Sequence, residues 1–167
     1  MPHNETDTHE PYVSSGLTCV VVDGNDTYSG SQGFDYFEGI SAQSAGSRGL
    51  SMLRLEMPPG ARARPHLHEH HETAIYVLSG RSEMRYGEGL RERLEVRAGQ
   101  FLFIPAGMPH LPYNPSDGEA CVLVLARTDS QEQESVVLLD EAGRRVPATD
   151  ASAGFVPADA SHMGSQQ

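Results

Sequence analysis

Gly60-Ala-Arg-Ala-Arg-Pro-His-Leu-His-Glu-His-His-Glu-Thr-Ala74 is the stretch from which the fold can be inferred, and it holds four of the eight histidines. His66 and His68 are two residues apart, and on an extended strand such side chains project from the same face. Neutral imidazoles that converge in this way, with a carboxylate nearby, can bind a divalent transition metal. A cluster of solvated surface histidines is the alternative that this stretch alone leaves open.

Short apolar runs, separated by turn residues, predict an all-β chain. The 167 residues include 17 glycines and 11 prolines, and no amphipathic stretch of useful helical length is present. The expected strands cover residues 17–22, 34–37, 53–57, 73–79, 81–86, 94–96, 101–104, 121–126 and 136–139. About ten short strands at this spacing indicate one sandwich or barrel.

The length suits one domain with a sizeable core. Residues 1–15 are polar and lack a hydrophobic period, so we expect a flexible leader there. The barrel is expected over residues 16–140. Residues 141–167 are rich in Ala, Asp, Ser, Gly and Pro, which predicts a disordered or loosely packed tail.

A second stretch, Gly99-Gln-Phe-Leu-Phe-Ile-Pro-Ala-Gly-Met-Pro-His-Leu-Pro-Tyr-Asn114, makes the pattern specific. The two stretches resemble the two motifs of the cupin superfamily in its single-domain form. The first motif is matched by Gly60, His66, His68 and Glu72, and the second by Gly99, Pro105, Gly107, His110 and Asn114. The resemblance covers roughly residues 50–126. It implies a small antiparallel jelly-roll barrel in which His66, His68 and His110 bind a metal inside the barrel mouth.

The acidic ligand of the family is the one departure from the pattern. It normally precedes the hairpin glycine by seven positions, which from Gly80 leads to Thr73, whereas counting forward from His68 leads to Glu72. On a strand, one residue changes the face. Either a bulge before Thr73 turns Glu72 inward, or Thr73 and His71 face inward and Glu72 does not. We expect Glu72 to be a metal ligand or a base beside the metal, with His71 as the alternative ligand or base.

Nitrogen ligands suit zinc, iron, nickel or copper rather than calcium or magnesium, and we expect zinc first and iron second. The site resembles that of the zinc-containing monocupin polyketide cyclases, which implies an enzyme that cyclises an oxygenated small molecule by Lewis-acid and base chemistry in the barrel mouth. One alternative is a dioxygenase or decarboxylase that uses iron, manganese, nickel or copper. The other is a cupin that binds a small ligand without catalysis. We prefer the cyclase, because the displaced acid matches a histidine-rich centre better than a set of three histidines and one glutamate.

Several further residues receive weaker assignments. Met52 and Phe103 are expected to be pocket walls, while Tyr76 and Tyr86 are expected to line the barrel or to lie in its core. Asn114 is expected to support its loop through side-chain hydrogen bonds. His70 is expected at the surface or behind the ligands.

Charge and cysteine usage limit the partners and the compartment. Formal charge is 12 − 23 = −11 without an Arg-rich cluster, which argues against nucleic acid or an anionic membrane as partner. No secretory signal pattern is present at the start of the sequence, so we expect a cytoplasmic protein, with Cys19 and Cys121 as buried free thiols. The exposed strand edges of a short barrel predict a homodimer.

Overall fold

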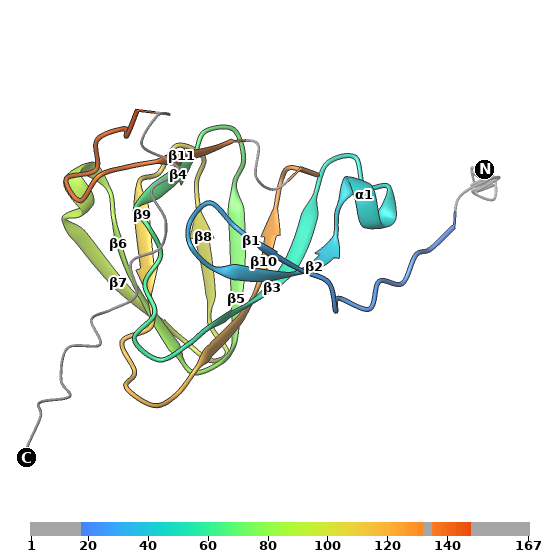
Figure 1. Cartoon of the computed structure of the whole chain (residues 1–167), viewed down its shortest axis with the longest axis horizontal. Helices are drawn as coiled ribbons and strands as arrows, with labels where there is room; N and C mark the ends of the chain where they lie inside the picture. Colours follow the sequence, from blue (N-terminus) through green and yellow to red (C-terminus); the bar gives the residue numbers. More distant parts are fainter. Residues whose placement is uncertain (1–17, 132–134, 148–167) are drawn as a thin grey trace, which may run out of the picture.

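The computed structural model describes residues 18–131 and 135–147, and nearly all of its regular structure is strand. Figure 1 shows two antiparallel sheets facing each other. The six-stranded sheet has the order β1 (Thr27–Ser29), β2 (Asp35–Ile40), β3 (Ser51–Met57), β10 (Cys121–Arg127), β5 (Thr73–Ser79) and β8 (Phe101–Ile104). The five-stranded sheet has the order β11 (Val136–Leu138), β4 (His66–His68), β9 (His110–Tyr113), β6 (Arg81–Tyr86) and β7 (Glu92–Arg97). The predicted all-β jelly roll is confirmed.

The core lies between the two sheets, and the period of two along each strand places it there. In β3, Leu53, Leu55 and Met57 are buried, whereas Met52 and Glu56 are exposed. Strand β10 pairs with β3 in antiparallel register and buries the apolar side chains at alternate positions in the same way. Burial of these apolar side chains is the main stabilising term of such a two-layer fold.

The turn between β5 and β6 depends on Gly80. Its φ is +74°, a conformation that glycine adopts more readily than residues with a Cβ. A Cβ at this position would also lie 2.6 Å from the carbonyl oxygen of Ala120. A glycine is therefore needed where the chain passes from the six-stranded sheet to the five-stranded sheet.

Two local predictions are wrong. Residues 18–22 form no strand, although their β-branched run predicted one, because no neighbouring strand of the described part pairs with them. Cys19 is accordingly exposed, while Cys121 is buried as expected. A short helix, α1 (Ala42–Ala45), lies between β2 and β3, and Ser41 caps it by accepting bonds from the N–H groups of Gln43 and Ser44.

The end of the described chain continues beyond the predicted barrel. Leu139 forms an isolated bridge with Arg145, and the Val146 N–H donates to the Leu138 carbonyl. Residues 141–147, assigned to the tail, therefore form a turn beside β11. The leader over residues 1–15 and the tail from residue 148 onward lie outside the described residues.

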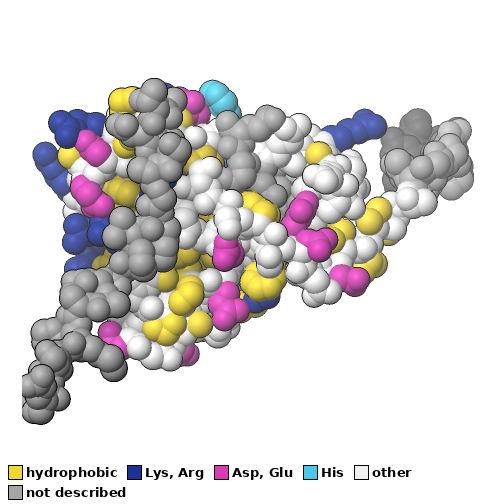
Figure 2. Space-filling model, in the orientation of Figure 1, with side chains coloured by type: hydrophobic (Ala, Val, Ile, Leu, Met, Phe, Trp, Pro, Cys, Tyr) yellow, Lys and Arg dark blue, Asp and Glu magenta, His cyan; other side chains and the backbone are white. Residues whose placement is uncertain are grey.

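Charged side chains gather on the outer face of β6 and β7. Figure 2 shows arginines in dark blue and acidic side chains in magenta between them on that side of the molecule. Arg81 and Arg97 contact Glu95, and Arg93 contacts Glu83. This face is solvated and ion-paired, unlike the apolar interior. Within the described residues, no helix has both the length and the apolar character needed to span a bilayer.

Candidate metal centre

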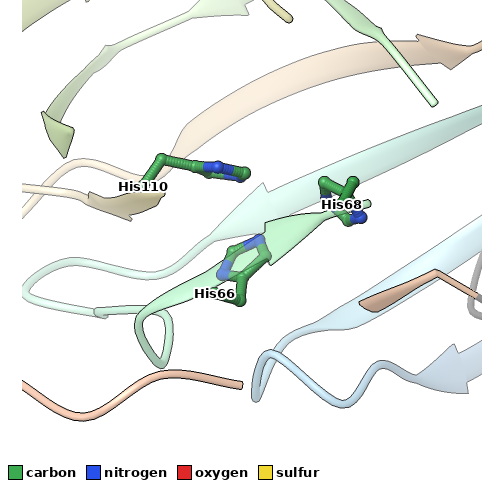
Figure 3. A group of neighbouring side chains, drawn as sticks. All are labelled: His66, His68 and His110. Atoms are coloured by element: carbon green, nitrogen blue, oxygen red, sulfur yellow. The ribbon is translucent and has the colours of Figure 1, made fainter. Parts of the chain in front are cut away.

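Three histidines from two strands converge between the sheets. His66 and His68 share the inward face of β4, and His110 of β9 stands directly opposite His66 in the β4–β9 pairing. One ring nitrogen from each lies within 4.8 Å of the others, and Figure 3 shows the rings beside one another. The side chains are 3%, 4% and 3% exposed, respectively. The three histidines therefore converge as predicted. Because all three are buried, the alternative of a cluster of solvated surface histidines is excluded.

Backbone carbonyls orient two of the three rings. His66 Nδ1 lies 2.7 Å from the Arg64 carbonyl oxygen, and His110 Nδ1 lies 2.8 Å from that of Met108. A carbonyl oxygen only accepts, so Nδ1–H must donate in both rings, and Nε2 then carries the lone pair. This tautomer is the one in which a histidine can bind a metal through Nε2.

The three rings are neutral because charging them in this place is unfavourable. Burial lowers the pKa of His110 to about 4, although the Met108 carbonyl opposes this shift. Burial, followed by the nearby His110, lowers the pKa of His66. Burial, followed by the nearby His66, lowers the pKa of His68. Neutral imidazoles are the protonation state that a metal requires.

The histidines border a small cavity with a volume of about 40 Å³. Thr73 and Arg127 also line it, and both are almost fully buried. The rest of the wall is largely apolar and includes Phe34, Tyr36, Leu55, Met57, Ile75 and Ile104. His68 Nδ1 and Thr73 Oγ1 are buried without a hydrogen-bond partner in the described part of the chain. Buried polar atoms usually have partners, so these orphaned atoms, with the neutral nitrogen donors, fit a site that receives a metal and its ligands.

Glu72 lies outside the three-histidine group. Its side chain is exposed, and its backbone N–H donates to Thr128 Oγ1 at 3.0 Å. The irregularity in the β10–β5 pairing lies between Val122 and Leu123, at the opposite end of the strand. The bulge that would turn Glu72 inward is therefore absent, and Thr73 takes the inward position opposite Arg127.

His71 lies against the group from the side of the six-stranded sheet. It is 1% exposed, and its ring centroid is 4.3 Å from that of His68. His71 Nδ1 is 2.8 Å from Ser135 Oγ and 3.6 Å from Asp129 Oδ2. Burial and then Arg127 lower the pKa of His71, while Asp129 opposes them. His71 Nε2 is buried and has no hydrogen-bond partner among the described residues.

Sequence reasoning did not single out three residues around His71. Arg127 continues the inward period of Cys121, Leu123 and Leu125, so extending the strand by one residue would have identified it. Asp129 and Ser135 follow the last residue of β10 and precede β11, in segments without a periodic pattern. Nothing in the sequence signalled that these two residues would meet His71.

Of the weaker assignments made from the sequence, some are right and others are wrong. Met52 and Phe103 are 45% and 59% exposed on the outer face, so neither is a pocket wall; Leu102 and Ile104, on the other face of β8, line the cavity. Tyr86 packs against the core, and Tyr76 contacts Phe101 on the outer face instead. His70 is exposed, as expected.

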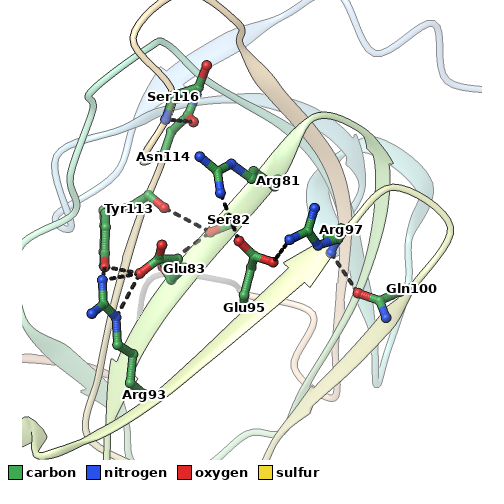
Figure 4. Close-up of polar contacts among 10 residues, drawn as sticks. All are labelled: Arg81, Ser82, Glu83, Arg93, Glu95, Arg97, Gln100, Tyr113, Asn114 and Ser116. Atoms are coloured by element: carbon green, nitrogen blue, oxygen red, sulfur yellow. Dashed lines mark hydrogen bonds and ion pairs between the residues drawn. The ribbon is translucent and has the colours of Figure 1, made fainter.

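Asn114 supports its loop as predicted. Its side-chain Nδ2 donates to the carbonyl oxygens of Met57, Pro58 and Glu119, and its Oδ1 accepts from the Ser116 N–H. Figure 4 shows the contact between Asn114 and Ser116 beside the strands of the five-stranded sheet. One buried amide thereby joins the end of β9 to the end of β3.

Two facing antiparallel sheets with a buried histidine cavity between them define a jelly-roll protein with a group able to hold a metal ion. The profile of the cupin domain matches residues 53–126, which include both histidine strands and the cavity walls between them. Residues 53–126 of this chain therefore match a cupin domain, and the two-sheet jelly roll is the fold expected of it.

Comparison with known proteins gives relatives of several kinds. Germin-like protein 3-1 of Oryza sativa subsp. japonica is 33% identical over 110 residues, which cover 64% of this chain and 48% of that protein. The polyketide cyclase RemF of Streptomyces resistomycificus is 25% identical, with a TM-score of 0.54 over 73% of this chain and 80% of that one. Oxalate decarboxylase of Bacillus subtilis has a TM-score of 0.61 at 21% identity, over 77% of this chain and 34% of that one, which shows the shared fold alone.

The chain spans less than half the length of the curated relatives that it matches, from 38% to 48%. The relatives include enzymes, and the match establishes the cupin fold for this chain without fixing one activity.

Proposed function

We propose that this protein is a metal-dependent enzyme that closes a ring on an oxygenated small molecule by Lewis-acid and acid–base chemistry. One observation carries the proposal: three neutral imidazoles converge in a cavity whose lining, among the described residues, includes no carboxylate. That donor set differs from three histidines and one glutamate, because Thr73 occupies the inward position and Glu72 faces outward. The likeness to the polyketide cyclase RemF supports the same reading.

His66, His68 and His110 are the residues that would hold the metal, for which zinc is our first choice and iron the second. When bound, a divalent ion of this kind supplies polarisation of a carbonyl oxygen. Arg64 and Met108 hold two of the rings through their carbonyl oxygens, which keeps the Nε2 lone pairs available. The apolar walls keep bulk water away from the reacting carbon.

His71 is the base in this proposal. Its Nε2 is buried and has no hydrogen-bond partner among the described residues, so in this proposal His71 would take a proton from a substrate carbon and return that proton to the oxygen left after ring closure. Ser135 and Asp129 face Nδ1 and would hold the ring during both transfers. Glu72, which we expected beside the metal, is too exposed to share this task.

The test combines metal analysis with turnover in the absence of oxygen. Protein purified without added metal is expected to contain about one zinc per chain, and anaerobic incubation with a poly-β-carbonyl substrate should give the cyclised product. Tightly bound iron together with oxygen consumption would contradict the proposal. Stoichiometric metal without turnover on any carbonyl substrate would favour a ligand-binding cupin.

The cavity favours a second candidate, an oxidase or decarboxylase that uses iron, manganese, nickel or copper and acts on a small carboxylic acid. The cavity volume of about 40 Å³ is far below the 300–1,000 Å³ of sites for larger ligands. The Arg127 guanidinium borders that cavity and is the kind of group that binds carboxylates. Carbon dioxide release or oxygen uptake with small dicarboxylic acids would support this candidate, and anaerobic ring closure would exclude it.

A further inference from the structure

A row of three buried polar side chains crosses the six-stranded sheet on its inner side. In the strand pairing, Arg127 of β10 stands between Ser51 of β3 and Thr73 of β5. Arg127 is 3% exposed, Ser51 0% and Thr73 2%. We call Ser51, Arg127 and Thr73 the polar row. Thr73 and Arg127 line the cavity that the three histidines also border.

Two members of the polar row carry hydroxyls that the fold itself does not use. Ser51 Oγ and Thr73 Oγ1 are buried and have no hydrogen-bond partner in the described part of the chain. An apolar group of the same shape would cost less free energy at either position, because burying an unpaired hydroxyl is unfavourable. Ser82 lines the same cavity from the other sheet, and its hydroxyl donates to the Tyr113 carbonyl oxygen, which is the usual arrangement. The two unpartnered hydroxyls therefore indicate a bound group that supplies their partner.

The charge on this side of the cavity is positive. The Arg127 guanidinium lies 5.7 Å from the centre of the Tyr36 ring, near enough for a cation–π contact, and Tyr36 also lines the cavity. The described residues that line the cavity include no Asp or Glu. A divalent ion held by neutral imidazoles would add two further positive charges, so an anionic group would be stabilised here.

The dimensions of the cavity limit this anion to a small group. A buried water needs about 10–15 Å³ of such space, so a volume of about 40 Å³ accommodates roughly three water-sized atoms. A carboxylate group, with one carbon and two oxygens, matches that size. Guanidinium and hydroxyl groups are both suitable donors to carboxylate oxygens. Size, charge and donor type therefore all favour a carboxylate.

We propose that the polar row binds a carboxylate group of the substrate, with the guanidinium of Arg127 and the hydroxyls of Thr73 and Ser51 as the donors. This inference rests on the proposed function for the reaction and names its substrate class, an oxygenated carboxylic acid. The histidines border the same cavity from the other sheet. The bound carboxylate would therefore direct the adjoining carbonyl group of the substrate toward them.

Acetate, with its neutral isostere acetamide as the control, tests the site by nuclear magnetic resonance on the full chain. Acetate is expected to cause saturable shifts of the backbone amides of Ser51, Thr73 and Arg127, whereas acetamide at the same concentration should cause none. Thr73→Val removes one hydroxyl without breaking a hydrogen bond. It should raise the dissociation constant for acetate about tenfold, as for loss of one hydrogen bond to a charged group. The urea midpoint should stay equal or rise, because an unpaired buried hydroxyl has been removed.

Ser82→Ala is the matched control, because this hydroxyl lines the same cavity but already has a partner. It should lower the urea midpoint and leave the dissociation constant for acetate unchanged. Arg127→Met should abolish acetate binding. If Arg127→Met does not fold, Thr73→Val and Ser51→Ala, which is expected to behave in the same way as Thr73→Val, still decide the question.

A carboxylate can also bind a metal directly, and His110→Ala separates the two cases because this variant is expected to lose the metal. Acetate shifts at the polar row that persist in His110→Ala support the inference. It would be overturned by loss of acetate binding in His110→Ala, by a folded Thr73→Val that binds acetate as tightly as the wild type, or by equal shifts with acetate and acetamide.

Failure of the proposed function would give a different result. Anaerobic ring closure at equal rates on a free acid and on its methyl ester would leave that function intact and overturn the inference about the carboxylate. Acetate binding at the polar row without ring closure on any carbonyl substrate would overturn the function and leave the carboxylate site in place.

Discussion

The two sheets contribute to the cavity in different ways. The five-stranded sheet supplies the three metal-binding candidates from the short strands β4 and β9, and backbone carbonyls of the adjoining loops hold two of the rings. The six-stranded sheet supplies Thr73 and Arg127 from long, fully paired strands, with His71 just before β5. The five-stranded sheet therefore provides the nitrogen lone pairs for metal binding, and the six-stranded sheet provides the charged and proton-transferring groups. Substitutions in the first should lower metal content, and substitutions in the second should lower turnover.

The largest expected effect belongs to the nitrogen donors. His66→Ala or His110→Ala removes one of three converging ring nitrogens, and we expect the bound metal to fall from stoichiometric to background levels. The apolar strands remain, so the far-ultraviolet circular dichroism should be unchanged. Metal content per chain, measured by mass spectrometry after dialysis, tests this.

His70→Ala is the matched control, because His70 belongs to the same stretch but its side chain is exposed. It should keep the full metal content. Equal metal content in His110→Ala and the wild type would show that the three rings do not hold the ion.

Next in size is the effect of His71 on turnover. His71→Asn removes the proposed base while keeping a polar group near Ser135, and we expect kcat to fall 10²- to 10⁴-fold, as for loss of a general base. Glu72→Gln changes an exposed carboxylate next to it and should alter kcat less than twofold. The pH profile of kcat separates the two residues further, since only the His71 variant should lose the limb set by the base.

The opposite result for these two variants would support the expectation from the sequence that Glu72 lies beside the metal. If Glu72→Gln lowered kcat or metal content more than His71→Asn, the inward residue in solution would be Glu72. In that case the strand register described here would be the wrong one for the active protein.

The residues that could be predicted from the sequence also differ between the two sheets. The shared face of His66 and His68 could be predicted because a period of two is a local feature, and His110 could be joined to them through the resemblance to the two cupin motifs. The orientation of Glu72 depended on whether a bulge preceded Thr73, and this is set by the pairing with β10, a strand almost fifty residues later. Local spacing does not contain that information.

The same reason explains the failure at residues 18–22. A β-branched run favours extended backbone, but a strand also requires a partner, and in the described structure the first pairing occurs only at β1. Asp129 and Ser135 could not be predicted either, because they meet His71 only after both sheets have formed.

Asn114 links the two walls, and its loss should cost stability rather than activity. The Asn114→Ala change leaves the carbonyl oxygens of Met57, Pro58 and Glu119 without their donor in a buried place. We expect the free energy of unfolding to fall by about 3 kcal/mol, the range for breaking a buried hydrogen-bond network. Urea unfolding at fixed protein concentration measures this; a change below about 0.5 kcal/mol would mean that water replaces the amide.

The smallest expected effect lies on the solvated outer face of the five-stranded sheet. There the Tyr113 hydroxyl donates to Glu83, and Arg93 also contacts this carboxylate, as Figure 4 shows. The Tyr113 hydrogen bond is the main cause that lowers the pKa of Glu83. A carboxyl whose pKa is lowered by folding stabilises the protein above its unfolded pKa near 4.5, and this contribution disappears as the pH falls through the folded value.

Tyr113→Phe should therefore lower the free energy of unfolding at pH 7 by only about 1 kcal/mol, since the partners are partly solvated. The difference from the wild type should shrink when both proteins are unfolded by urea at a pH well below 4.5, because the contribution of the lowered Glu83 pKa is lost as the pH falls through the folded value. Metal content should not change at pH 7, because Tyr113 faces away from the three histidines. If Tyr113→Phe lowered the free energy of unfolding equally at both pH values, the effect of Tyr113 would come from packing of its ring. The contrast between the solvated outer face and the interior that transfers protons would then depend on His71 alone.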